Sequence, residues 1–330
     1  MTPDSPVPLA VLVLPDAFMS SVMGFIDTFS IPGSVLQPPH AFAAYTVAES
    51  PQVSIGPTRL PLRVDRVIDE AVPAVIVIPA LVIDEQDWVP GRYPKTVAWL
   101  KAMHERGALI CSACSGSLLL AETGLLDGRI ATSHWALDQV FERVFPKVKL
   151  RLDRALVIDE EDDRVVMSGA AAAWHDLAIY LVARFAGSAT ASAVAKFFMM
   201  QWHDSGQAPF RRFREELGHG DAAVLRAQSW LRSHWSGARP VEGMIRAAAL
   251  PERSFARRFR KATGCSPIEY VQGIRIEYAK QALEESDDPV EEICRRCGYE
   301  DTSFFRRVFK RTTALTPADY RRKFRLPQYG

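Results

Sequence analysis

The first half of the chain alternates short apolar runs with longer amphipathic stretches. The runs are mostly β-branched or aliphatic, as in buried parallel strands, and they cover residues 9–14, 43–48, 74–78 and 108–111. A helical pattern over 93–106, closed by Gly107, is typical of the stretches between them. This alternation predicts a flavodoxin-like α/β three-layer sandwich around a parallel sheet, with ligands at the carboxyl ends of the strands.

The second half has a helical pattern throughout. Its first part predicts helices over 222–235 and 241–249, one that starts at Pro251 and stops before Gly264, and a long one over 267–285. The plan then repeats as helices over 290–297, 302–311 and 317–323. We therefore expect an all-α domain with two helix-turn-helix units joined by one long helix.

Between the halves, residues 188–203 have the pattern of an amphipathic helix that packs under the first domain or forms a dimer seam. Residues 211–220 are polar, basic and bounded by glycine, which predicts a hinge. We expect a first domain at 1–187, a helix and linker at 188–220, and a second domain at 221–330.

One sequence pattern occurs twice in the second domain, fifty residues apart. The sequence FARRFRK at 255–261 returns as FRRVFKR at 305–311, and SPIEY at 266–270 returns as TPADY at 316–320. Two phenylalanines at i, i+4 share one face of each helix, so the basic residues lie on the opposite face. We expect these aromatics to pack in a core rather than to stack on bases; they are Phe255, Phe259, Phe305 and Phe309.

A helix with a cationic outer face is suited to the major groove of double-stranded DNA. The outward positions are Arg253, Ala256, Arg257, Arg260 and Lys261 on the first helix, and Thr302, Ser303, Arg306, Arg307, Lys310 and Arg311 on the second. Residues near the helix N-termini should reach base edges, whereas Lys261 and Arg311 should contact phosphate. The alternative is an ordinary solvated charged face.

The charge distribution favours DNA as the partner. The net charge of the chain is only +1, but residues 226–330 hold 21 Lys and Arg against 13 Asp and Glu. The first 225 residues hold 19 basic and 26 acidic residues. One half is therefore suited to a polyanion and the other is not.

Other features limit the class of protein. No apolar run approaches the length of a membrane span, and the N-terminus lacks the pattern of a signal peptide. Five cysteines without a framework spacing suit a reducing cytoplasm. The pairs Cys111/Cys114 and Cys294/Cys297 lie in different domains, so we expect neither a metal site nor a cofactor.

One strand end carries candidate chemistry. The strand at 108–111 runs into Cys114 and then into a helix at 117–122, the pattern of a nucleophile elbow that lifts one side chain above the sheet. Gly116 allows close packing, and the helix N-terminus offers amides to an anion. His134, expected at a neighbouring strand end, could activate the Cys114 thiolate.

The run from Cys114 to Trp135, CSGSLLLAETGLLDGRIATSHW, resembles the signature of PfpI-like, class I glutamine amidotransferase-like domains. Further support comes from WHD at 174–176 and SGQ at 205–207. The sequence CRRCGYED at 294–301, followed by Phe305 and Phe309, is similar to the AraC/XylS DNA-binding domain. Together they resemble GlxA-like transcriptional regulators. This resemblance implies a homodimer that responds to a small nitrogenous metabolite, such as an amino acid or a quaternary amine.

Three interpretations of Cys114 remain open. It could be the nucleophile of a cysteine-dependent amidase with His134, it could line a non-catalytic ligand pocket, or it could be a small buried side chain. PfpI-type peptidases have a histidine after the nucleophile where this chain has Ser115, and the loop after the first strand offers only Asp16 as an assisting acid. We expect no enzyme but an effector pocket lined by Cys114, Ser115, His134, Trp135, Asp16 and Phe18.

The two copies also differ. Ala314 stands where Gly264 closes the first outward-facing helix, which predicts a strained or missing left-handed cap. Pro251 stands where Asp301 can cap the second, and proline has no capping oxygen. These differences affect local geometry rather than the fold.

Overall fold

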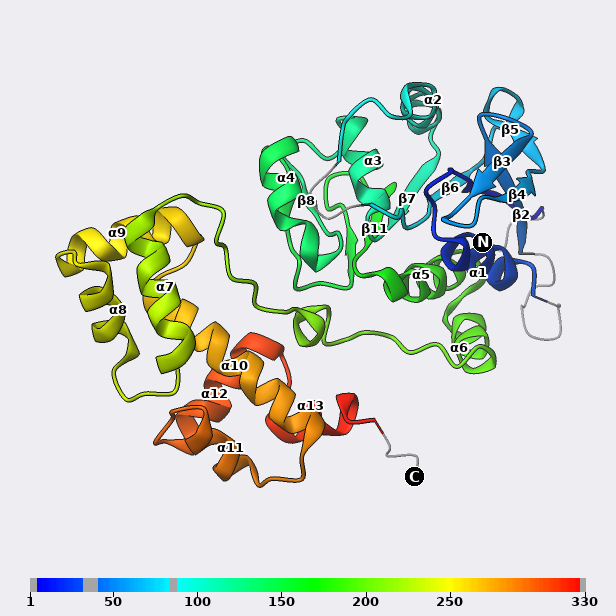
Figure 1. Cartoon of the computed structure of the whole chain (residues 1–330). Helices are drawn as coiled ribbons and strands as arrows, with labels where there is room; N and C mark the ends of the chain where they lie inside the picture. The colour runs from blue at the N-terminus through cyan, green and yellow to red at the C-terminus, as the bar shows by residue number, and fades with distance from the viewer. Residues whose placement is uncertain (1–4, 32–40, 84–87, 327–330) are drawn as a thin grey trace. The chain divides into compact units, whose positions relative to one another are not determined.

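The computed structural model describes residues 5–31, 41–83 and 88–326. The chain folds into two compact units, Met1–Gln207 and Ala208–Gly330 (Figure 1). Their boundary falls inside the segment expected to form a helix and linker. Within the described residues, every helix is too short or too polar to span a bilayer.

The first unit is built on a seven-stranded sheet with the order β10-β11-β7-β6-β1-β2-β5. The strands are β1 (Val7–Leu12), β2 (Phe42–Ala48), β5 (Arg66–Val67), β6 (Val75–Ile78), β7 (Leu109–Ala113), β10 (Leu156–Ile158) and β11 (Val165–Ser168). All neighbours pair in parallel except β10 with β11. The four predicted strands are β1, β2, β6 and β7, each within two residues of the expected bounds.

Helices cover both faces of this sheet (Figure 1). One layer holds α1 (Met19–Phe29), α5 (Trp174–Ala186) and α6 (Ser188–Phe197), and the other holds α2 (Pro94–Glu105) and α3 (Gly116–Glu122). Helix α4 (Asp138–Val144) follows the short strand β8 (Ile130–Ala131) in the chain. The predicted α/β sandwich is confirmed.

Several short elements were not predicted, because they have too few residues to show a periodic pattern. They are the hairpin of β3 (Gln52–Ile55) with β4 (Leu60–Arg63), strand β9 (Lys149–Leu150), and 3-10 turns at Ile68–Glu70, Trp135–Leu137, Ala171–Ala173 and Ala208–Phe210. The strand expected before His134 is present as β8, which pairs in parallel with β9. The hairpin forms one wall of a pocket.

The helix expected over 188–203 ends at Phe197 as α6, and the following segment is irregular. Ala191 and Val194 are buried in the core of the first unit, and α6 packs against α5. Helix α6 therefore packs under the first domain, and the dimer seam stays a prediction. Phe197 and Met199, at and just beyond its end, are exposed.

The second unit is helical in all its described secondary structure. Its helices are α7 (Ala222–His234), α8 (Pro240–Ala248), α9 (Glu252–Thr263), α10 (Pro267–Glu285), α11 (Val290–Arg296), α12 (Thr302–Thr313) and α13 (Pro317–Phe324). Each lies within two residues of its predicted bounds. The prediction of two units joined by a long helix is confirmed, with α10 as the joining helix (Figure 1).

Helix α10 contributes to two separate cores. Its N-terminal half packs with Phe255 and Phe259, and its C-terminal half packs with Phe305 and Phe309. All four aromatic rings are fully buried, as expected for core residues. The pair Cys294 and Cys297 is also buried in the second core.

The duplication in sequence is a duplication in geometry. The Phe259 and Tyr270 rings meet edge-on, with centroids 5.1 Å apart and planes at 88°. Fifty residues later, Phe309 and Tyr320 meet at 5.4 Å and 86°. Such edge-to-face pairs stabilise each helix against the one that follows it.

The caps of the two copies differ as the sequence predicts. The Asp301 carboxylate accepts hydrogen bonds from the N–H groups of Ser303 and Phe304, whereas Pro251 offers no side-chain cap to α9. At the other end, Ala314 adopts a left-handed conformation with φ 59°, where Gly264 has φ 77°. The left-handed cap is therefore present in both copies, and in the second it strains an alanine by about 1–2 kcal/mol.

The segment expected to be a hinge packs along α10 instead. The Lys280 ammonium donates a hydrogen bond to the Arg211 carbonyl oxygen at 2.5 Å, and the Phe213 N–H donates to the Glu277 carboxylate at 3.0 Å. The Phe213 ring also meets the Tyr270 ring edge-on, with centroids 4.9 Å apart. The polar composition of the segment predicts a free linker, but its backbone is hydrogen-bonded to side chains of α10.

Candidate ligand and nucleic-acid sites

The strand-to-helix turn predicted at Cys114 is present at the carboxyl end of β7. Cys114 has φ 53°, an unusual value for a residue with a side chain, and its N–H donates to the Ser168 carbonyl oxygen of β11 at 2.9 Å. A Cβ at Gly116 would lie 2.4 Å from the Pro79 carbonyl oxygen. Glycine is required there because α3 begins directly against the end of β6.

The Cys114 thiol is not activated. The residue is only 4% exposed, and burial raises its pKa to about 11, although hydrogen bonds from Ser115 partly oppose the shift. A thiol with this pKa is protonated near neutral pH, and the thiolate is the nucleophilic form. The geometry of a nucleophile elbow is therefore present without its usual electrostatics.

Ser115, also predicted to line the ligand pocket, makes two hydrogen bonds to the backbone of Leu81. Its hydroxyl accepts a hydrogen bond from the Leu81 N–H at 2.7 Å and donates one to the Leu81 carbonyl oxygen at 2.6 Å. The residue is 2% exposed. Ser115 thus holds the segment after β6 against the elbow.

Asp16 lies in the loop after β1, where an assisting acid was sought. Its carboxylate accepts a hydrogen bond from the Tyr93 hydroxyl at 2.6 Å and lies 3.2 Å from the Arg92 guanidinium. The acid is thus engaged with these two side chains. Phe18, two residues on, is the N-cap residue of α1 and is 40% exposed.

His134 and Trp135 lie just after the end of a short strand. They follow β8, which pairs with β9 and is not part of the main sheet. The Ser133 hydroxyl nevertheless donates a hydrogen bond to the Cys114 carbonyl oxygen at 3.2 Å. His134 Nδ1 accepts from the Ala136 N–H, and its ring tilts against that of Trp135 with centroids 5.0 Å apart.

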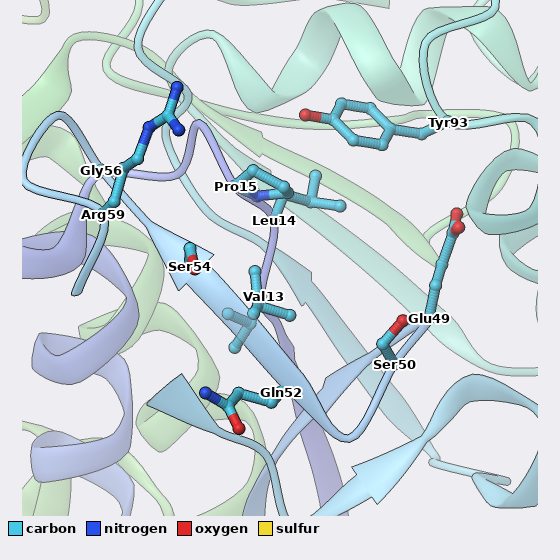
Figure 2. Close-up of a pocket in the computed structure, with 11 residues that line it drawn as sticks. Val13, Leu14, Pro15, Glu49, Ser50, Gln52, Ser54, Gly56, Arg59 and Tyr93 are labelled. Carbon is cyan, nitrogen blue, oxygen red and sulfur yellow. The ribbon is translucent and has the colours of Figure 1, made fainter. Parts of the chain in front are cut away.

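A pocket of about 490 Å³ lies at the carboxyl ends of β1 and β2. It is formed by the residues that follow β1, the residues that follow β2, the hairpin β3–β4, and Tyr93 before α2 (Figure 2). None of the six predicted effector residues is among those that line it. This site was not predicted, because the hairpin is too short to show a clear pattern. The signals in the sequence were the alternation in QVSI and a Gly-Pro turn at 56–57.

In the second unit, the outward faces of α9 and α12 are cationic, as predicted. Ten of the eleven predicted positions are exposed: Arg253, Ala256, Arg257, Arg260, Lys261, Ser303, Arg306, Arg307, Lys310 and Arg311. Thr302 is half-buried and hydrogen-bonds the Cys294 thiol. The exposed faces are opposite the buried phenylalanines of the same helices.

Side-chain contacts hold part of the second face. The Arg306 guanidinium pairs with the Glu291 carboxylate at 2.7 Å, and Arg311 donates a hydrogen bond to the Gln272 side chain at 2.8 Å. Both guanidinium groups remain on the surface. A DNA phosphate could replace Glu291 as the partner of Arg306, because an exposed ion pair contributes little stability.

Phe304 is a surface residue that the sequence analysis did not name. It lies near the N-terminus of α12, is 42% exposed, and its ring lies under the Arg307 guanidinium with 5.7 Å to the ring centroid. An exposed aromatic on the outer face of such a helix can contact the methyl group of thymine. Its position immediately before Phe305 was the signal available in the sequence.

Both units match known families. Residues 41–183 match the DJ-1/PfpI family, and residues 244–323 match a helix-turn-helix domain. The chain joins a DJ-1/PfpI domain to an AraC-type helix-turn-helix domain. A solved structure of a Vibrio parahaemolyticus protein, 16% identical with a TM-score of 0.52, covers 58% of this chain and 99% of its own, and shares the fold.

Curated relatives resemble this two-domain chain at low identity. It is 26% identical over 234 residues to the HTH-type transcriptional regulator CdhR of Pseudomonas aeruginosa, covering 69% of this chain and 67% of that protein. It is 26% identical over 240 residues to the HTH-type transcriptional regulator GlxA of Rhizobium meliloti, covering 72% of each. The chain spans 60 to 72% of the length of such relatives.

The motif at 174–176 has a structural role in the DJ-1/PfpI domain. Asp176 is fully buried, and its carboxylate accepts the His203 N–H at 2.8 Å and hydrogen-bonds His203 Nδ1 at 2.7 Å. This contact fixes the segment after α6 to the body of the domain. The chain therefore approaches the boundary of the two domains in a defined conformation up to Gln207.

Proposed function

We propose that this chain is a sequence-specific DNA-binding transcription regulator. The AraC-type domain binds double-stranded DNA, and the DJ-1/PfpI domain binds a small nitrogenous effector without catalysing a reaction. The observation that carries this proposal is the repeated unit in which one helix face is buried aromatic and the opposite face is exposed and basic.

The basic faces are suited to reading bases as well as to holding phosphate. Arginine can donate two hydrogen bonds to the O6 and N7 atoms of guanine, which Arg257 and Arg307 would do from the middle of each helix. Lys261 and Arg311, a turn further on, would contact phosphate. The remaining outward residues named above complete the two faces. Two such helices suit successive major grooves, about 34 Å apart on one side of the duplex.

The names of the relatives support the same function. CdhR and GlxA are both named as HTH-type transcriptional regulators, and each aligned segment is longer than either unit of this chain. From these relatives we carry over to this chain only the class of function, transcription regulation. Neither name identifies an effector or an operator.

Two observations favour a sensor over an amidase in the first domain. The Cys114 thiol has a raised pKa, and the Asp16 carboxylate is engaged with Tyr93 and Arg92. An amidase would need a thiolate or a base poised to form one. Cys114, Ser115 and His134 then contribute to the fold of the domain rather than to a reaction.

The regulator acts as a homodimer in the cytoplasm, as its resemblance to GlxA-like proteins implies. A dimer would present four basic helices to one operator, and the operator would show the two-fold symmetry of the protein.

Selection of randomised duplexes by the full-length chain tests the proposal. We expect enrichment of a two-fold symmetric motif in which each half-site holds two blocks about 10 base pairs apart, one for each basic helix of a protomer. The matched control is the chain with Arg257→Ala and Arg307→Ala, which should enrich no motif. If the unsubstituted chain enriches nothing over the starting pool, the proposed function is wrong.

A further inference from the structure

The pocket of the DJ-1/PfpI domain lies where an open α/β sheet binds ligands. The chain leaves β1 toward β2 on one side and leaves β6 toward β7 on the other, so the crevice beyond β1 and β6 is a switch point of the sheet. Leu14 and Pro15 come from the end of β1, and Tyr93 comes from the segment after β6. The volume of about 490 Å³ is in the range of small-molecule sites.

The hairpin β3–β4 is fastened over this crevice. The Gly56 N–H donates a hydrogen bond to the Pro15 carbonyl oxygen at 2.8 Å, which joins the hairpin turn to the loop after β1. Arg59, in the same turn, has φ 51°, a strained value for arginine. Strain of this kind is retained where a side chain must be held in one position.

The pocket has one cationic and one anionic residue, at different sides. Among the residues that line it, Arg59 and Glu49 carry charge. Figure 2 shows Arg59 on the hairpin side and Glu49 on the opposite side, with its carboxylate directed toward Tyr93. Apolar atoms of Leu14 and Pro15 lie between them.

Glu49 and Tyr93 are both held in place. One oxygen of the Glu49 carboxylate accepts hydrogen bonds from the Thr96 N–H at 3.0 Å and the Thr96 hydroxyl at 2.6 Å, which also caps α2. The Tyr93 hydroxyl donates to Asp16 at 2.6 Å. A second carboxylate oxygen and an aromatic ring are thus presented by side chains that need not reorganise on binding.

We propose that this pocket is the effector site and that it takes a zwitterionic small molecule. The ligand carboxylate pairs with the Arg59 guanidinium, and its cationic nitrogen lies by the Glu49 carboxylate and the Tyr93 ring. The carbon skeleton contacts Leu14 and Pro15. The role of the ligand as an effector rests on the proposed function. Binding of the ligand to this pocket does not depend on DNA.

Charge-matched probes test the ligand class with the full-length chain. The probes are the twenty L-amino acids and the unbranched ω-amino acids from 3-aminopropanoate to 6-aminohexanoate. Each is paired with the acid that lacks its amine and the amine that lacks its carboxylate. Melting temperature identifies binders, since binding to the folded state stabilises it, and calorimetry gives the Kd. We expect at least one zwitterion to bind about tenfold more tightly than either partner compound.

Substitutions at the two charges assign the site. Glu49→Gln keeps the oxygen that accepts from Thr96, and Arg59→Asn suits the left-handed backbone. Each should raise the Kd about tenfold or more, whereas Arg59→Lys should retain part of the binding. Arg63→Gln, on β4 and outside the pocket, is the matched control and should leave the Kd unchanged.

The proposal is overturned if no zwitterion binds, if the acid or amine alone binds as well, or if both pocket variants keep the original Kd. Failure of the proposed function looks different. In that case the zwitterion binds and the pocket variants weaken it, but the chain selects no DNA motif.

Discussion

The side-chain amide of Gln207 donates a hydrogen bond to the Ser133 carbonyl oxygen at 2.9 Å. Ser133 in turn donates its hydroxyl to the Cys114 carbonyl oxygen at the elbow. Gln207 is the last residue of the first compact unit. A short chain of hydrogen bonds therefore links the carboxyl edge of the sheet to the point where the chain leaves the DJ-1/PfpI domain.

Removing this amide should loosen the end of the first domain. Gln207 is 2% exposed, and its Nε2 atom also donates to the Thr132 hydroxyl and the Arg154 carbonyl oxygen. The Arg154 oxygen keeps the Thr132 hydroxyl as a donor, so Gln207→Ala removes the donor chiefly from the Ser133 carbonyl oxygen. We expect a loss of about 1–3 kcal/mol in the unfolding free energy of this domain. Hydrogen exchange of residues 200–207 should become faster.

The matched control for that change is Gln201→Ala, an exposed residue of the same segment, which should alter neither quantity. Unchanged exchange in Gln207→Ala would show that the amide does not hold the segment.

Cys114 should resist alkylation until the solution is strongly alkaline. Burial raises the thiol pKa to about 11, and only the thiolate reacts. Between pH 9 and 11 the folded chain therefore keeps this proton while an unfolded chain loses it, so the site also loses stability as the pH rises. Mass spectrometry after a short iodoacetamide pulse at pH 7 and pH 10 measures the labelling, with half-buried Cys265 as the internal reference.

Cys114→Ala should also leave DNA affinity unchanged. Rapid labelling of Cys114 at pH 7, or amide hydrolysis that this substitution abolishes, would favour the amidase alternative instead.

Arg257→Ala and Arg307→Ala should each weaken specific binding by about 1–3 kcal/mol, because each would remove a bidentate contact to guanine. Each should also relax the base preference in the block that its own helix reads, in both half-sites, and leave the block read by the other helix intact. Quantitative binding to a set of single-base operator variants measures both effects.

Arg239→Ala provides the control, since Arg239 is exposed and pairs with Glu242 on α8 rather than on an outward basic face. If all three variants lose affinity equally on every duplex, the arginines serve only as general positive charge.

Phe304 should read a thymine methyl group. Replacing thymine by deoxyuridine at the contacted position removes that methyl, which should cost the unsubstituted chain about 0.8 kcal/mol, or roughly fourfold in Kd. Phe304→Ala should bind both duplexes equally, and Phe304→Leu should keep part of the difference. If all three proteins prefer thymine over deoxyuridine to the same extent, Phe304 does not contact the thymine methyl group.

The sequence predicted the second domain more completely than the first. Its helices are bounded by proline and glycine, and duplication supplied each assignment twice, so FARRFRK and FRRVFKR gave both the buried and the exposed faces. The cap at Ala314 shows the limit of such analysis. A left-handed alanine could be recognised only by its correspondence to Gly264.

The candidate effector site was predicted less well, for physical reasons. The elbow at Cys114 has a local signature. The burial of Cys114 and the hydrogen bonds of Ser115, however, depend on residues far away in the sequence, such as Leu81. The pocket depends on a hairpin of two four-residue strands that lie outside the main sheet. Arg59 and Glu49 are ten residues apart and carry no motif, so only the folded chain shows that they share a cavity.

The most direct test of DNA reading is a competition measurement on the full-length chain at physiological salt. Fluorescence anisotropy would compare the selected duplex with a scrambled duplex of the same length and composition. The account predicts at least about a thousandfold preference for the selected duplex, a ratio typical of specific regulators. Equal affinity for the two duplexes would contradict it, because the basic faces would then hold phosphate without reading sequence.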